Sequence, residues 1–251
     1  MKKNPFIKAL CAITALLFWI ALWYLAAKKV DQSLVLPTPV EVFRRLVELS
    51  ATREFYRVIL TSFVRVMLGF SSAMLSGFLL AALAHFFPIV KTLFSPFMAI
   101  IKATPVASFI LLVLLWIDKG VVPIFISFLM VIPIAWQNTL LGFEKRDPLL
   151  TETAKVFRIP LFRKLFKIDL PQILPFLLSA AKTSVGLAWK AGVAAEVLAM
   201  PKRSVGLMIY QAKFYLESVD LYAWTLAIIL LSLLPEGLFF IAKHRKGGNR
   251  A

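Results

Sequence analysis

Residues 121–143 read VVPIFISFLMVIPIAWQNTLLGF and contain no charged residue. A helix needs about 20 apolar residues to cross the hydrocarbon core of a bilayer. The run is continuous rather than alternating, which favours a helix over a strand of a membrane barrel. A helix also satisfies its own backbone hydrogen bonds inside the bilayer. We therefore expect this stretch to form a transmembrane helix.

Similar apolar blocks lie on both sides of this stretch. They are residues 9–27, 60–86, 94–117, 173–200 and 221–242. The sequence thus predicts an all-α integral membrane protein with about six transmembrane helices in one domain, residues 1–251. A cleaved signal peptide is an alternative for the first block, but a signal peptide has an apolar region of only about 7–15 residues and an A-x-A-like cleavage site. Because the block is longer and lacks that site, we expect a retained helix.

The composition excludes most soluble classes of protein. Of the 251 residues, 60% are hydrophobic and 17% are charged, with a mean hydropathy of +0.83. Soluble domains are roughly 45–50% apolar and about 25% charged. The net charge of +16 gathers at the ends of the apolar blocks, which indicates contact with a membrane rather than with nucleic acid. One cysteine and two histidines leave little for a disulfide, a metal site or a catalytic centre.

The distribution of lysine and arginine predicts the orientation. More of these residues flank the blocks on the side that holds both termini and residues 144–172. Under the positive-inside rule this side is cytoplasmic. On the outer side, Thr38-Pro39-Val40-Glu41 has the pattern of a capping box, which predicts an amphipathic helix at the outer interface.

The longest predicted cytoplasmic segment, residues 144–172, has structure of its own. Asp147-Pro148 predicts the start of a short helix through about Phe157. A second amphipathic stretch covers 161–168, and we expect Pro171 to end it. Two short helices with an apolar face at a membrane surface form a docking element for a soluble partner.

This segment resembles the EAA motif of ABC importer permeases, which reads E-A-A, three residues, G, nine residues, I-x-L-P. Five of its seven defined positions match without a gap. The motif positions of this chain are Glu152, Thr153, Ala154, Arg158, Ile168, Leu170 and Pro171. Thr153 replaces the second alanine and Arg158 replaces the glycine. Glycine would permit a left-handed turn between the two short helices, so Arg158 either stands in a right-handed turn or carries strain.

Nearly the whole chain is similar to the nitrate/sulfonate/taurine branch of these permeases. Weaker matches include Pro37-Thr38-Pro39, Ser62-Phe63-Val64-Arg65 and Gly186-Leu187-Ala188-Trp189. The resemblance implies a prokaryotic inner-membrane protein that forms the path for a small anionic solute. It also implies a second permease copy, two ATPase subunits, and an external solute-binding protein as partners, with residues 144–172 as the ATPase-coupling loop.

The residues themselves agree that any ATPase is a separate chain. The sequence contains no G-x-x-x-x-G-K-[ST] phosphate loop, so we expect this chain to bind no cofactor and ATP to be used by the partner. Two other functional classes compete with this interpretation. A membrane enzyme would need clustered catalytic groups, and an autonomous secondary transporter would be expected to have internal repeats. We recognise neither feature, and the secondary transporter remains the alternative.

Charges within the apolar blocks mark candidate functional positions, because intramembrane charge is costly. Lys102, Lys190 and Glu196 are candidates for the translocation path or for an intramembrane charge network. For Arg65 and Lys182 we favour anchoring at the membrane surface. Small residues recur every four positions at 69–81 and at 180–192, which predicts close helix packing within the chain or at a dimer contact. Glu196 extends the second of these ridges, so we expect it to be buried.

Overall fold

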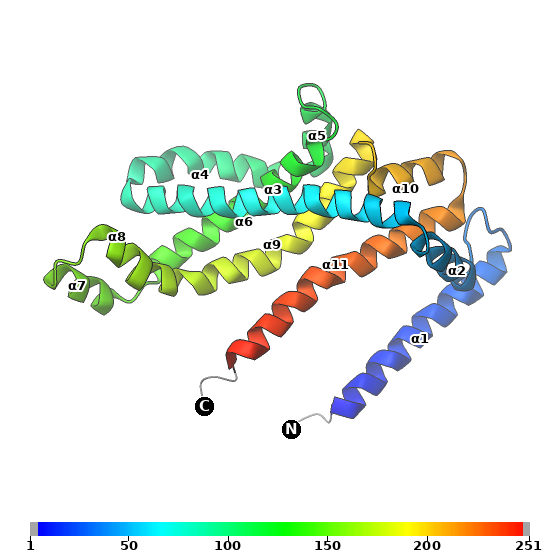
Figure 1. Ribbon diagram of the computed structural model, residues 1–251, viewed down its shortest axis with the longest axis horizontal. Helices are drawn as coiled ribbons and strands as arrows, with labels where there is room; N and C mark the ends of the chain where they lie inside the picture. The colour runs from blue at the N-terminus through cyan, green and yellow to red at the C-terminus, as the bar shows by residue number, and fades with distance from the viewer. Residues whose placement is uncertain (1–4, 248–251) are drawn as a thin grey trace.

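The computed structural model describes residues 5–247, and within that range the side chains other than those of residues 5–9, 155, 161 and 234–247. Every regular element in this range is a helix (Figure 1). In chain order they are α1 Pro5–Val30, α2 Pro39–Ser50, α3 Arg53–Phe86, α4 Pro88–Ala103, α5 Val106–Val113, α6 Val122–Glu144, α7 Pro148–Val156, α8 Leu161–Lys164, the π-helix η1 Leu165–Asp169, α9 Leu170–Ala199, α10 Val205–Phe214 and α11 Ser218–Gly247.

Helices α3, α6 and α9 pack together along the long axis of the molecule and form its main core (Figure 1). Helix α4 lies against α3 and α6, and α5 contacts α6 and α9. The core is apolar, with Ile126, Trp136 and Trp189 almost fully buried. Trp189 donates its indole N–H to the carbonyl oxygen of Ile228, 3.3 Å away, so this buried donor has a partner on α11.

Both ridges of small residues pack inside the chain. A Cβ added at Gly69 would lie 2.8 Å from Ser127 Cβ and closer still to the carbonyl oxygen of Ile124. On the second ridge, a Cβ at Gly192 would lie 2.5 Å from Val66 Cγ2. The glycines therefore permit the close approach of α3, α6 and α9. The dimer contact that the sequence also allowed is not the role of either ridge.

A second apolar cluster lies where α2, α10, α11 and the start of α3 meet. The predicted capping box is present at Thr38, where the Glu41 side chain accepts from the Thr38 backbone N–H at 2.8 Å. This hydrogen bond lowers the pKa of Glu41. Arg45 pairs with Asp220 at 2.6 Å, which raises the pKa of Arg45 and fixes α2 to α11. Helix α2 is thus a packed element as well as an amphipathic one.

Within the part of the chain that the structure describes, three helices are long and apolar enough to cross a membrane: Leu10–Val30, Arg53–Phe86 and Val122–Glu144. A fourth results if α4 and α5 are taken as one broken span. The sequence predicted a continuous helix over 94–117, and this prediction was wrong because the chain bends by 104° between α4 and α5. Thr104 precedes Pro105, and the proline ring disfavours helical conformation in the preceding residue. Of the other two predicted spans, 221–242 falls within α11, and 173–200 coincides with α9 except for Met200, which follows the last helical residue.

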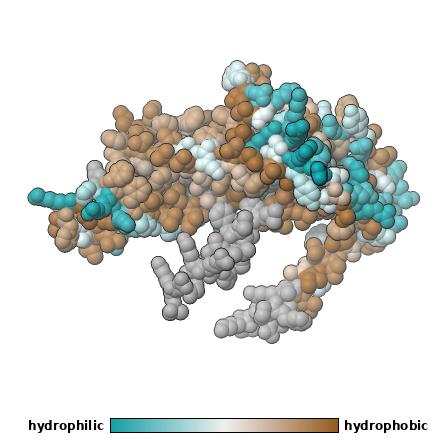
Figure 2. Space-filling model, viewed as in Figure 1, coloured by the Kyte–Doolittle hydropathy of each residue, from teal (hydrophilic) through white to brown (hydrophobic). Residues whose placement is uncertain are grey.

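Hydropathy divides the visible surface along the long axis (Figure 2). Hydrophobic residues cover most of the visible surface over α3 and α4. Hydrophilic residues gather mainly over the part near α2 and α10, and a smaller hydrophilic patch lies beside hydrophobic residues at the end that carries α7 and α8. An apolar belt between two polar ends is the surface that a bilayer requires.

Candidate functional site

The α6–α9 loop, residues 145–169, forms one end of the molecule (Figure 1). Helix α7 begins as predicted: Asp147 Oδ1 accepts the N–H of Leu149 at 2.8 Å, and Pro148 occupies the first helical position. The helix ends in a left-handed residue, Arg158, with φ of 47°. The N–H of Ile159 bonds to the carbonyl oxygen of Ala154 at 3.0 Å, which closes the helix as in a Schellman turn.

The left-handed turn decides between the two alternatives for Arg158. A glycine would adopt this turn without a steric penalty, whereas Arg158 carries the strain of a side chain in the left-handed conformation. We predict that Arg158→Gly raises the free energy of unfolding by about 1 kcal/mol. The measurement is the thermal unfolding midpoint in detergent, with Arg163→Gly as the control because Arg163 lies in helix α8, where glycine is unfavourable. An unchanged or lower midpoint for Arg158→Gly would contradict the strain.

The motif residues divide between the outside and the inside of this loop. Glu152 and Thr153 are exposed, whereas Ala154 is only 2% exposed and is buried by this chain itself. Burial by other parts of this chain accounts for the small side chain at Ala154.

Large apolar side chains cover the outside of the same loop. Phe157 is 73% exposed and Phe162 is 76% exposed. We define the docking face as these two residues together with Leu149, Val156 and Phe166. Aromatic and branched side chains exposed together on a loop at one end of a molecule indicate a surface that a partner covers.

The second half of the loop differs from the prediction. Pro171 was expected to end a helix, but α9 begins at Leu170 and continues through Pro171 and Pro175 to Ala199. The π-helix η1, Leu165–Asp169, precedes α9, and the N–H of Leu170 bonds to the carbonyl oxygen of Leu165. Pro171 then takes an early helical position, where its missing N–H costs little.

Asp169, the variable position of the I-x-L-P part of the motif, is 2% exposed. Its Oδ1 lies 2.5 Å from Nη1 of Arg146, whose side chain is 9% exposed. Sequence reasoning missed this pair. The available signal was an acidic residue inside an apolar stretch together with an arginine three residues after an apolar block.

Glu196 is fully buried, as its position on the small-residue ridge predicted. It accepts from Ser62 Oγ at 2.7 Å and lies 3.6 Å from Nη1 of Arg65. Arg65 also donates to the carbonyl oxygen of Lys202 at 3.1 Å. Arg65 therefore belongs to an internal charge network between α3, α9 and the turn before α10, and the prediction of a surface anchor was wrong.

Lys102 and Lys190 lie apart from this network. Lys102 Nζ donates to Oε1 of Gln137 on α6. Lys190 is exposed on α9, on the same stripe as Ser179 and Thr183, because residues four and eleven positions apart point within about 40° of each other on a helix. Among the described side chains, neither lysine has a carboxylate within ion-pair distance.

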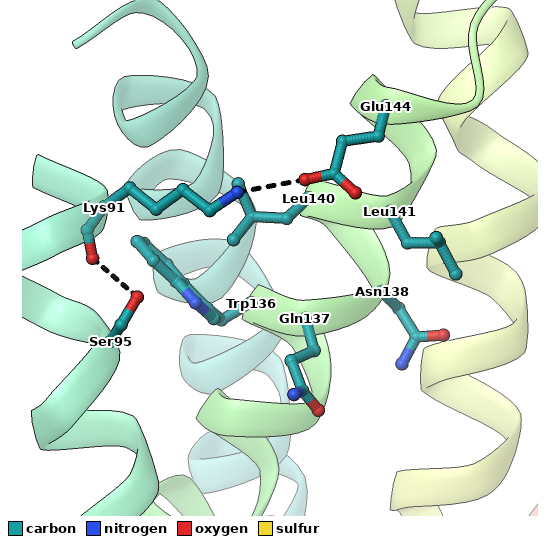
Figure 3. Close-up of a pocket in the computed structure, with 8 residues that line it drawn as sticks. All are labelled: Lys91, Ser95, Trp136, Gln137, Asn138, Leu140, Leu141 and Glu144. Atoms are coloured by element: carbon teal, nitrogen blue, oxygen red, sulfur yellow. Dashed lines mark hydrogen bonds and ion pairs between the residues drawn. The ribbon is translucent and has the colours of Figure 1, made fainter. Parts of the chain in front are cut away.

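Polar side chains of α6 line two neighbouring grooves between α4, α6 and α9. Gln137 and Asn138 line an open groove of about 500 Å³ beside α4, in which Lys91 pairs with Glu144 at 3.0 Å (Figure 3). Asn138 also lines a neighbouring groove of about 340 Å³ with Ser179 of α9. The exposed faces of α4, α6 and α9 thus carry amide, hydroxyl and ammonium groups between apolar helices. Sequence reasoning missed Gln137 and Asn138 because uncharged polar residues are inconspicuous in an apolar block.

Comparisons with known proteins give a consistent result. The sequence profile of the family described as "Binding-protein-dependent transport system inner membrane component" matches residues 73–244. The chain is 26% identical to the putative aliphatic sulfonates transport permease protein SsuC of Bacillus subtilis (strain 168), over 90% of this chain and 82% of the relative. It is 23% identical to the taurine transport system permease protein TauC of Escherichia coli (strain K12), over 85% and 80%. It is 24% identical to the nitrate import permease protein NrtB of Synechococcus elongatus, over 84% and 79%.

Proposed function

The chain belongs to the family of inner-membrane components of binding-protein-dependent ABC importers, and from this premise we propose how it works. It is a multi-pass membrane permease rather than an enzyme. In our proposal, two permease copies enclose the translocation path, two ATPase subunits bind on the cytoplasmic side, and an external binding protein delivers the solute. The chain spans the inner membrane of a prokaryote six times, with both termini in the cytoplasm.

One observation carries this proposal: the docking face of the α6–α9 loop. Its phenylalanines are mostly exposed at an end of the molecule that lies beyond the apolar belt. Burying one phenylalanine side chain contributes about 1.5–3 kcal/mol, so a partner that covers several of them gains substantial affinity. The loop holds Phe157 and Phe162 between the capped helix α7 and the π-helix η1, and Phe166 lies in η1 itself. This arrangement provides a firm surface for an ATPase subunit. The exposed carboxylate of Glu152 adds a polar contact for a basic group of the partner.

We propose that the transported solute is a small anion. The names of three relatives refer to sulfonates, taurine and nitrate, and each of these solutes bears an anionic group. In this chain, Lys102 and Lys190 offer ammonium groups on exposed faces that also carry Gln137, Asn138, Ser179 and Thr183. Lipid is a poor neighbour for such faces, whereas a water-filled path between two permease copies suits them.

The test of this path is Lys190→Met, expressed together with the partner ATPase. Methionine keeps the length of the side chain and removes its charge, so we expect uptake of the anion to fall at least about tenfold while assembly and basal ATP hydrolysis remain. Lys190→Arg is the matched control and should retain most uptake. Poor assembly of Lys190→Met would assign the lysine to an ion pair with a second copy, and unchanged uptake with normal assembly would remove Lys190 from the path.

A further inference from the structure

The start and the end of the α6–α9 loop are joined by buried contacts. Arg146 lies two residues after the end of α6 and Asp169 directly precedes α9. Their side chains meet at 2.5 Å with almost no exposure to solvent. The backbone N–H of Asp147 donates to Oε1 of Gln172 at 2.8 Å, which joins the same two segments a second time. The loop is therefore closed at its base, and α7, η1 and the docking face cannot swing freely about its two ends.

The same arginine connects this base to α3 and α6. Nη2 of Arg146 lies 2.6 Å from Nε2 of His85, and since arginine can only donate, Nε2 is the accepting nitrogen. Nε of Arg146 donates to the carbonyl oxygen of Phe143 at 2.9 Å. The rings of His85 and Phe143 stack with their centroids 4.5 Å apart. The guanidinium of Arg146 thus contacts α3, the end of α6 and the residue that precedes α9. It therefore joins the three helices that form the main core.

We propose that Arg146 and Asp169 are the positioning residues of energy coupling, an inference that rests on the proposed function. A partner that moves the docking face exerts force on the loop, and the closed base transmits that force to α3, α6 and α9 together. Without the pair, the loop would hinge at residues 145–147, where the chain leaves helical conformation.

Two features favour this role over simple stabilisation. A buried ion pair stabilises a fold little more than apolar side chains of similar volume would, because both charges lose their hydration. What the pair adds is a fixed direction and distance between two segments. In addition, Asp169 is the last residue of the π-helix η1. π-helices are rare in proteins, and those that occur often lie at functional sites.

The experiment measures solute taken up per ATP hydrolysed, in vesicles that hold the permease together with its ATPase. Asp169→Asn keeps the volume of the side chain and removes its charge. Arg146→Lys keeps the charge and removes the planar guanidinium that contacts Asp169 through Nη1 and His85 through Nη2. We expect both variants to assemble and to hydrolyse ATP, and uptake per ATP to fall about tenfold for Asp169→Asn and less for Arg146→Lys. Glu54→Gln is the control, because it removes one partner of the exposed pair Glu54–Arg57 and should leave the ratio unchanged.

The outcomes separate the two proposals. An unchanged ratio in assembled Asp169→Asn overturns the positioning role, while normal ATP-driven uptake by the unaltered complex leaves the proposed function intact. Failure of both variants to assemble would limit the pair to folding and would also overturn the inference. Absence of ATP-driven uptake by the unaltered complex would instead refute the proposed function itself.

Discussion

Phe157→Glu should abolish binding of the partner ATPase and, with it, ATP-driven uptake. Phe157 is 73% exposed at the end of α7 and belongs to the docking face. The substitution removes the apolar area that the partner covers and places a carboxylate in a surface that loses its water on binding. Central aromatic residues of an interface commonly contribute 2 kcal/mol or more, so we expect affinity to fall about 30-fold or further. The measurement is the amount of ATPase that co-purifies with the permease from membranes.

The matched control for this prediction is Phe214→Glu. Phe214 lies on α10 at the opposite end of the molecule and is 68% exposed, so the chemical change and the exposure are nearly the same (Figure 1). We expect this variant to bind the ATPase at the unaltered level. If Phe157→Glu retained the ATPase as well as the control does, the docking face would be assigned wrongly.

Gly69→Leu should prevent the main core from forming. The first atom of any side chain at this position already meets Ser127 Cβ at 2.8 Å and comes closer to the backbone of Ile124, which cannot rotate away. Helices α3 and α6 would have to separate, and overpacking of this kind costs at least about 3 kcal/mol. We expect loss of monodisperse protein after extraction in detergent, or a large decrease in the unfolding midpoint.

Ser71→Leu tests whether this effect depends on position rather than on added volume. Ser71 is two residues from Gly69 on the same helix, but its side chain is exposed. The variant should therefore insert and remain stable. A stable Gly69→Leu protein with an unchanged midpoint would show that α3 and α6 do not pack as closely as described.

The helical architecture could be predicted from the sequence because long apolar blocks determine where membrane helices form. The prediction failed where a single residue acts locally on the backbone. Pro105 breaks the third apolar block, whereas Pro171 and Pro175 stay within α9. Pro171 follows the π-helix η1, which the sequence pattern does not reveal. A proline marks a possible break, and its surroundings decide whether the break occurs.

The candidate site could be predicted in part. The spacing of the motif identified the α6–α9 loop and the cap at Asp147, which depend on neighbours in sequence. It did not identify the contact of Arg146 with Asp169 or of Arg65 with Glu196, because these residues are brought together only by the packing of separate helices. The inward position of Ala154 was missed for the same reason. Local patterns predict local structure, and pairs across helices need the fold.

In our proposal, ATP hydrolysis by a separate subunit drives solute through this chain. The most direct measurement is uptake of a small anion by proteoliposomes that contain the purified permease, with and without its partner ATPase. We expect accumulation only when the ATPase is present and ATP is supplied on the side of the α6–α9 loop, and no ATP hydrolysis by the permease alone. Accumulation driven by an ion gradient, in proteoliposomes that hold the permease without ATPase or ATP, would contradict the account and indicate a secondary transporter.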